Sequence, residues 1–414
     1  MFTQQDKLIL KKLADLVHEI ASMPEQQKKR DMWKKHTALK HGIPPIFISP
    51  EGSWVELIPP ESLQCEDSFA RQVERELRRR IYRFDHIPDD TPIEDHYDIP
   101  VAEIPLNDCW GLPVMRRDAQ GRGAWHHQPV IEEIEDWDQL FKKPMPILQV
   151  DEKGAREKAR ELQDAVGDAL KVHVTGVKIY DFHIAHVYCD FRGLDNLFVD
   201  MIDDEERVKD VFAHFTEGML GIQRQVKEMN LIQSNNDYTY HYTGGLGYCD
   251  DLPAYTEKPT DYSCIWGAAE AQEYSCVSPD MFYNTVLPFE KKLLEPFGLN
   301  GYGCCDDLTE KLDGVLEIKN LRRVAACPWA NLGKMAQRLK KDYILTWKPN
   351  PAYLAGEYFD EAQVEKYMLE SLEAAKCGYP EIILRDTHSC RNDPKRFTQF
   401  ALLTRRAIEK VYNL

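Results

Sequence analysis

Strand-like and helix-like stretches alternate along the second half of the chain, and this alternation restricts the fold more than any other feature. Short apolar, β-branched runs lie between amphipathic segments whose apolar residues recur at helical spacing. Parallel strands joined by crossover helices produce this pattern. The predicted strands cover residues 172–180, 231–233, a run that ends at Cys304, and residues 322–326, 343–346 and 381–384. The sequence therefore predicts an α/β fold with a parallel sheet.

The number of units favours an eight-stranded (β/α) barrel, the TIM barrel, since residues 99–150 can supply one or two further strands. An open doubly wound sheet is the alternative. The chain contains neither a GxGxxG nor a GxxxxGK[ST] motif, so no dinucleotide or phosphate-loop fingerprint is present. Amphipathic helices are predicted at residues 4–24 and 62–83. We therefore divide the chain into an N-terminal helical extension, residues 1–98, and a barrel, residues 99–414.

Composition excludes several classes of function. The formal net charge of −17 argues against a nucleic-acid-binding surface, because phosphate binding depends on Lys and Arg. No apolar block near the N-terminus is typical of a signal peptide, and no stretch reaches the roughly 20 apolar residues of a membrane span. We expect a cytoplasmic protein. Its 11 cysteines are then thiols or metal ligands rather than a disulfide framework.

Sulfur-bearing and polar residues follow the predicted strands. In a barrel all strand ends of one kind lie on one face, where these residues would converge. Zinc prefers thiolate and imidazole ligands, and a catalytic site needs three of them. The candidate metal ligands are Cys304, Cys305, Cys390, His388 and His241, and the candidate catalytic residues are Asp237, Asp306 and Tyr302. The alternative is that the cysteines are packed core thiols and the histidines are structural.

Two segments resemble the uroporphyrinogen decarboxylase superfamily. One is residues 191–201, FRGLDNLFVDM, and the other is residues 277–288, which contain VSPDMF and VLP. The resemblance covers roughly residues 100–414 and implies a (β/α)8 barrel. One branch of the superfamily comprises zinc-dependent methyltransferases of corrinoid systems. These carry a His-x-Cys after one strand and a further Cys after the last strand, which matches Cys304 and Cys390, with Tyr302 in place of the histidine.

The resemblance implies a methyltransferase that contains Zn2+ and moves a methyl group between a small substrate or thiol and a corrinoid carried by a partner protein. A homodimer is a further expectation. One alternative is a cofactor-free decarboxylase of a porphyrinogen or other small acid. Its substrate-binding arginine motif has a near match at residues 115–122, MRRDAQGR. The other alternative is a non-catalytic tetrapyrrole- or corrinoid-binding protein.

Overall fold

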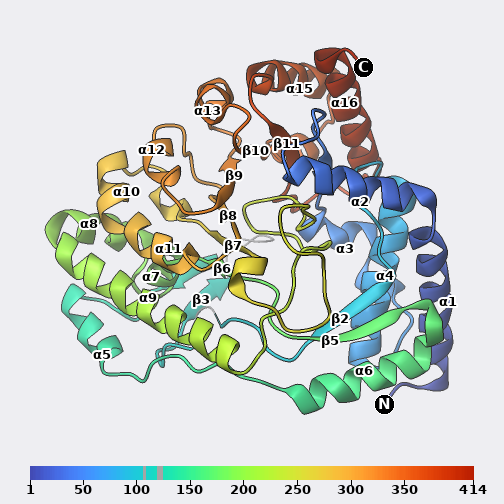
Figure 1. The fold of residues 1–414 in the computed structure, drawn as a ribbon, viewed down its shortest axis with the longest axis horizontal. Coiled ribbons are helices and arrows are strands. Elements are labelled where there is room, and N and C mark those ends of the chain that lie inside the picture. Colours follow the sequence, from blue (N-terminus) through green and yellow to red (C-terminus); the bar gives the residue numbers. More distant parts are fainter. Residues whose placement is uncertain (106–108, 119–124) are drawn as a thin grey trace.

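A parallel sheet of seven strands forms the centre of the computed structural model, which describes residues 1–105, 109–118 and 125–414 (Figure 1). The α/β class and the parallel pairing predicted from the sequence are both confirmed. In spatial order the strands are β1 (Ile46–Ile48), β11 (Pro380–Leu384), β10 (Ile344–Trp347), β9 (Leu321–Ala326), β8 (Leu299–Tyr302), β7 (Trp266–Ala269) and β6 (Asp181–Phe182).

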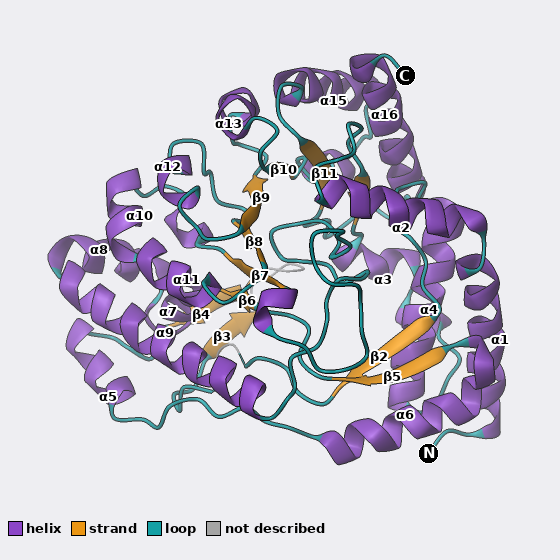
Figure 2. Ribbon diagram, viewed as in Figure 1, coloured by secondary structure: helices purple, strands orange, loops and turns teal. Residues whose placement is uncertain are grey.

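Helices that follow the strands cover the outer face of this sheet (Figure 2). Residues alternate in direction along each strand, so Leu345 and Trp347 join the core shared with the helices while Thr346 points to the opposite face. The covering helices are α7 (Ile184–Arg192), α8 (Leu194–Asp203), α9 (Glu205–Glu228), α10 (Pro279–Thr285), α11 (Leu287–Leu294), α12 (Leu312–Val315), α13 (Leu332–Leu339), α14 (Ala352–Ala355), α15 (Glu361–Ala375) and α16 (Lys395–Tyr412).

The N-terminal region consists mostly of helices packed on one another. Asp6 is buried between α1 and the start of α4, where its carboxylate accepts hydrogen bonds from Thr3 and Glu66 backbone amides. The helices of this region are α1 (Gln4–Ala21), α2 (Pro24–Thr37), α3 (Trp54–Leu57), α4 (Ser68–His86) and α6 (Glu152–Val166), whereas α5 (Trp137–Phe141) lies apart from them and packs Trp137 against Tyr188 and Phe191 of α7. None of the helices in the described parts of the chain has the length and apolar character needed to cross a bilayer.

Two features of the sheet refine the predicted architecture. The strands of the described residues do not form a closed eight-stranded barrel, because β1 and β6 are the two edges of the sheet. Beyond β1, the carboxylates of Asp89 and Asp90 accept the Ile48 and Ile46 amides at 2.9 and 2.8 Å, where a neighbouring strand would otherwise pair. The predicted N-terminal extension is also not only helical, since β1 comes from it and pairs with β11.

Two small sheets lie beside the main one. β2 (His96–Pro100) pairs in parallel with β5 (Lys171–Thr175), and β3 (Met115–Asp118) pairs antiparallel with β4 (Trp125–Gln128). The arginine motif suggested at residues 115–122 ends outside the described residues. The strand predicted at 231–233 contributes one parallel bridge, between Ile232 and Val177.

The long connection between α9 and β7, residues 229–261, lies against the inner face of the sheet (Figure 1). We call it the inserted loop, because it fills the space that a closed barrel would enclose. Its backbone approaches the strands so closely that a Cβ on Gly244 would lie 2.2 Å from Thr346 Cγ2. A Cβ on Gly301 of β8 would likewise lie 2.6 Å from Thr243 Oγ1. Gly244 has φ +141° and Gly245 has φ +73°, conformations that glycine adopts without steric cost.

We expect Gly244→Ala to lower the free energy of unfolding by about 3 kcal/mol, because the new methyl group adds both backbone strain and overpacking. Chemical denaturation would measure the loss. The matched control is Gly42→Ala, where a Cβ meets nothing within 4 Å. That change should alter stability by less than about 1 kcal/mol. Equal effects at the two positions would contradict the close packing of the loop.

Candidate functional site

The carboxyl edge of the main sheet carries a concentrated group of polar side chains. Each comes from the first few residues after a parallel strand, and the carboxyl ends of parallel strands meet at one edge. The group comprises His183 after β6, Glu270 after β7, Cys304, Cys305 and Asp306 after β8, Lys348 after β10, and Arg385 and Asp386 after β11.

A thiol and an ammonium group form the centre of this edge. Cys304 Sγ lies 3.1 Å from Lys348 Nζ and 3.6 Å from Cys305 Sγ. Cys304 and Lys348 are both buried, whereas Cys305 is exposed. The hydrogen bond from Cys305 and the positive charges of Lys348 and Arg385 lower the pKa of the Cys304 thiol against the effect of burial. Of the two thiols, Cys304 is therefore the one that is more readily deprotonated.

The turn after β8 fixes the direction of the two thiols. Gly303 adopts φ +89°, and a Cβ there would meet Leu308 at 2.6 Å. The buried Asp306 carboxylate accepts the Cys304 amide at 2.7 Å. Burial, together with the charge of Glu270, raises the pKa of Asp306 to about 6. Asp306 thus holds the turn through one oxygen and retains a titratable carboxyl group beside the thiols.

His183 and Glu270 form a second charged pair at the same edge. His183 Nδ1 lies 2.7 Å from Glu270 Oε1, and the other Glu270 oxygen accepts the Gln272 amide at 2.8 Å. Burial disfavours the imidazolium, but the hydrogen bond and charge of Glu270 outweigh it and raise the pKa of His183 to about 8. The negative charge of Cys304 contributes to the same shift. His183 is thus a proton donor at neutral pH.

Two tyrosines of the inserted loop form the aromatic part of the site. The Arg385 guanidinium lies 4.8 Å from the ring centre of Tyr240 and 5.0 Å from that of Tyr242. It also pairs with Glu51 after β1, with Nε 2.5 Å from Oε1. Tyr242 packs edge-on against His183 at 4.6 Å. The two tyrosines therefore form an aromatic wall of the site, between the Arg385 guanidinium and the His183 imidazole.

The structure does not gather all of the residues predicted from the sequence. Cys304, Cys305 and Asp306 lie together at the carboxyl edge. Cys390 instead donates to Glu56 Oε2 at 3.2 Å, and burial together with that carboxylate raises its pKa to about 12. His388 is exposed beside Gly52, whose added Cβ would lie 3.1 Å from His388 Nδ1.

The remaining candidates also lie elsewhere. The hydroxyl of Tyr302 donates to Glu290 Oε2 at 2.5 Å within the core on the helix side of β8. The His241 ring is buried, 5.2 Å from Trp266, and burial and the charge of Arg323 lower its pKa well below the usual value. Asp237 forms an ion pair with Lys178 in a separate cleft.

Only part of the predicted zinc site fits a single ion. Two thiolates on one tetrahedral zinc, each about 2.3 Å from the metal, lie about 3.8 Å apart, close to the separation of Cys304 and Cys305. Asp386 Oδ2 is 3.5 Å from Cys305 Sγ. In the parts of the chain that the structure describes, however, neither thiol belongs to a group of three ligand atoms within 4.8 Å of one another. The other three predicted ligands are not beside them.

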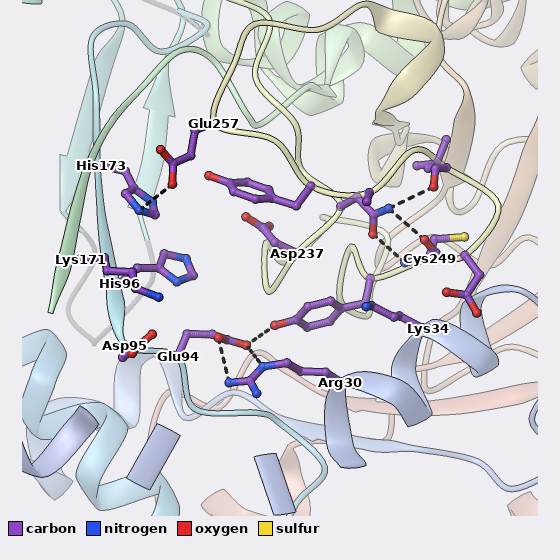
Figure 3. Close-up of a pocket in the computed structure, with 16 residues that line it drawn as sticks. Arg30, Lys34, Glu94, Asp95, His96, Lys171, His173, Asp237, Cys249 and Glu257 are labelled. Carbon is purple, nitrogen blue, oxygen red and sulfur yellow. Dashed lines mark hydrogen bonds and ion pairs between the residues drawn. The ribbon is translucent and has the colours of Figure 1, made fainter. Parts of the chain in front are cut away.

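A second polar group lies in a cleft of about 510 Å³ (Figure 3). His96 and His173 come from one wall, and Asp237 faces them from the loop. Ligand atoms of His96, Asp98 and Asp237 lie within 4.8 Å of one another. Sequence reasoning missed His96 and Asp98, because it placed the strand in this region near residues 99–109 instead of 96–100.

Sequence reasoning also missed Glu270, Lys348 and Arg385, and His183 was not among its candidates. A usable signal was present: Glu270, Lys348 and Arg385 each directly follow the last residue of a strand. Polar residues at that position of a parallel sheet are placed on the functional edge by topology alone.

Comparison with known proteins gives little further information. No protein-family model matches the chain, and no curated protein matches it either. Among solved structures, a methyltransferase from Methanosarcina mazei is similar over 92% of this chain and 99% of its own, with a TM-score of 0.48 and 10% sequence identity.

We expect the His183–Glu270 pair to make stability depend on pH. Below pH 6.5 His183 is protonated in both the folded and the unfolded protein, and the pair contributes fully; this contribution is lost as pH rises through about 8. The advantage of the wild type over His183→Gln in free energy of unfolding should therefore shrink by about 2 kcal/mol between pH 6 and 9. Urea denaturation across this range measures it, and a constant difference would contradict the assigned ion pair.

We expect Lys348→Met to slow alkylation of Cys304 by iodoacetamide about tenfold at pH 7 in chelator-treated protein, because the thiolate loses its counter-ion. Fragmentation mass spectrometry distinguishes Cys304 from Cys305. The control is Lys334→Met, since Lys334 is exposed and pairs with Glu310. An unchanged rate in Lys348→Met would show that the ammonium does not stabilise the thiolate.

Proposed function

We propose that the protein is a methyltransferase whose active site is the carboxyl edge of the sheet. The observation that carries the proposal is the buried Cys304 thiol, paired with Lys348 and placed beside Cys305. A nucleophilic or metal-binding sulfur at the carboxyl end of a strand suits methyl transfer to or from a thiol. We interpret the seven-stranded sheet as an open form of a (β/α) barrel.

We further propose that Cys304 and Cys305 hold a zinc ion, with Asp386 as the nearest carboxylate. Zinc bound there would act as a Lewis acid that lowers the pKa of an acceptor thiol. Cys390, His388 and His241 lie apart from this pair, so they are not part of the ligand set we propose. A corrinoid protein as the methyl-carrying partner also belongs to the proposal, on the sequence resemblance alone.

The surrounding residues have defined tasks in this proposal. When a small methylated substrate donates its methyl group to the corrinoid, His183 donates a proton to the leaving atom of that substrate. When a thiol accepts the methyl group instead, the neutral imidazole takes up the proton that the thiol releases. Glu270 keeps His183 charged and correctly oriented. Lys348 and Arg385 attract an anionic part of the substrate, and Tyr240 and Tyr242 exclude water from one side.

A decarboxylase of a small acid is the second candidate. The observation that favours it is the presence of the cations Lys348, Arg385 and His183 around one site, which suits a substrate carboxylate. This reaction needs no thiol. It would survive both chelation and the loss of Cys304, whereas methyl transfer would not.

We expect free methylcobalamin to lose its methyl group to a small thiol in the presence of the zinc-loaded protein. Cys304→Ser should lower the rate at least about 100-fold, since it removes a group that acts in the transition state. Absorbance of the corrinoid measures the rate, and elemental analysis measures bound zinc independently. Cys264→Ser is the control, because Cys264 lies on a short turn before β7.

Wild-type turnover in both Cys304→Ser and Cys305→Ser, with zinc content unchanged, would overturn the proposal. Release of carbon dioxide from small acids by Cys304→Ser would instead support the decarboxylase.

A further inference from the structure

The cleft of Figure 3 is separate from the two thiols, since neither Cys304 nor Cys305 lines it. His96 and Lys171 in its wall are the first residues of β2 and β5. Cys249 and Leu252, also in its wall, pack against Trp266, the first residue of β7. The cleft therefore opens near the amino ends of strands, and the proposed active site does not use it.

Three elements bring nitrogen and oxygen donors together in this cleft. His96 and Asp98 are two residues apart on β2, so their side chains leave the same face of the strand. His173 stands opposite Asp98 in the register of β5. Asp237 comes from the inserted loop, which lies against the inner face of the sheet. Ligand atoms of His96, Asp98 and Asp237 all lie within 4.8 Å of one another, close enough to share one ion.

Neighbouring groups hold these donors in place and leave ligand atoms available. Asp237 Oδ1 accepts both the amide and the hydroxyl of Thr239, at 2.8 and 2.5 Å, which orients its other oxygen toward the cleft. His173 lies 3.4 Å from Asp98 Oδ1 and, by its other nitrogen, 3.4 Å from Glu257. His96 Nε2 is buried and makes no hydrogen bond within the described residues. Partners of this kind orient metal ligands in proteins.

Lys178 supplies the only positive charge in contact with both carboxylates among the residues the structure describes. Its Nζ lies 2.6 Å from Asp98 Oδ2 and also bonds Asp237 Oδ2. Two carboxylates therefore face one ammonium group.

We propose that His96, Asp98 and Asp237 form a binding site for one divalent first-row transition-metal ion, with the ammonium of Lys178 as the cation that the metal displaces. Imidazole and carboxylate donors together suit such ions. The displaced ammonium has a place to go, because the rings of Tyr238 and Tyr255 lie 5.2 and 5.5 Å from Nζ. The bound ion would connect β2 to the inserted loop.

The test titrates Co2+ into the full-length, chelator-treated Cys304→Ser/Cys305→Ser protein, followed by calorimetry and visible absorption. The double variant lacks the proposed thiol site, so any Co2+ that it binds is held elsewhere. The result therefore decides on the cleft alone and does not depend on whether the protein is a methyltransferase. We expect one Co2+ per chain without thiolate-to-cobalt absorption bands. In the same background, His96→Ala and Asp237→Asn should each weaken binding at least about tenfold, as expected for lost ligands.

The most specific variant is Lys178→Met, which removes the competing ammonium and keeps the length of the side chain. It should bind Co2+ about tenfold more tightly, because the ion no longer displaces a paired charge. Asp250→Asn is the control and should change affinity little, because Asp250 is an exposed carboxylate elsewhere in the wall of the cleft. Circular dichroism verifies folding of each variant. Absence of Co2+ binding in both the double variant and its Lys178→Met derivative, or binding unaffected by His96→Ala, would overturn the proposal.

Discussion

The close approach of one loop to the inner face of the sheet is the constraint on which both polar sites depend. Positions 244, 245 and 301 are glycines because the opposing side chains leave no room for a Cβ. The Asn235 side chain connects the start of this loop to the strands, with bonds to Lys178 O at 2.9 Å and to both the amide and carbonyl of Trp266 at 2.9 and 3.0 Å. A side-chain amide thus replaces part of a strand ladder.

Two buried lysines show how the protein stabilises charge on the two sides of this loop. Lys348 faces the Cys304 thiolate at the carboxyl edge, and Lys178 faces Asp98 and Asp237 in the cleft. A buried charge is tolerated only when a partner offsets its loss of hydration. In each place the partner is an anionic donor that also suits a metal ion. Each ammonium group therefore stabilises its site, but it does not determine which ligand the site binds.

The sequence predicted the sheet better than the site because strand periodicity is local, whereas the site depends on where each strand ends. Strands β9, β10 and β11 lie close to the predicted ranges. The predicted pairing of His388 with Cys390 assumed that strand alternation continues past Leu384. The strand ends there, and Asp386 adopts φ +57°, so alternation no longer applies. Cys390 then turns toward Glu56 instead of the thiols.

The position of the inserted loop could not be predicted from sequence patterns, for a related reason. Its contacts with Thr346 and Ile383 join residues more than 100 positions apart, and no periodicity in the loop encodes them. The same loop carries Asp237 into the cleft and Tyr240 and Tyr242 to the carboxyl edge. Five residues extend at most about 17 Å, so the backbone positions of Asp237 and Tyr242 cannot lie farther apart than this. One short segment of the loop therefore supplies side chains to both polar sites.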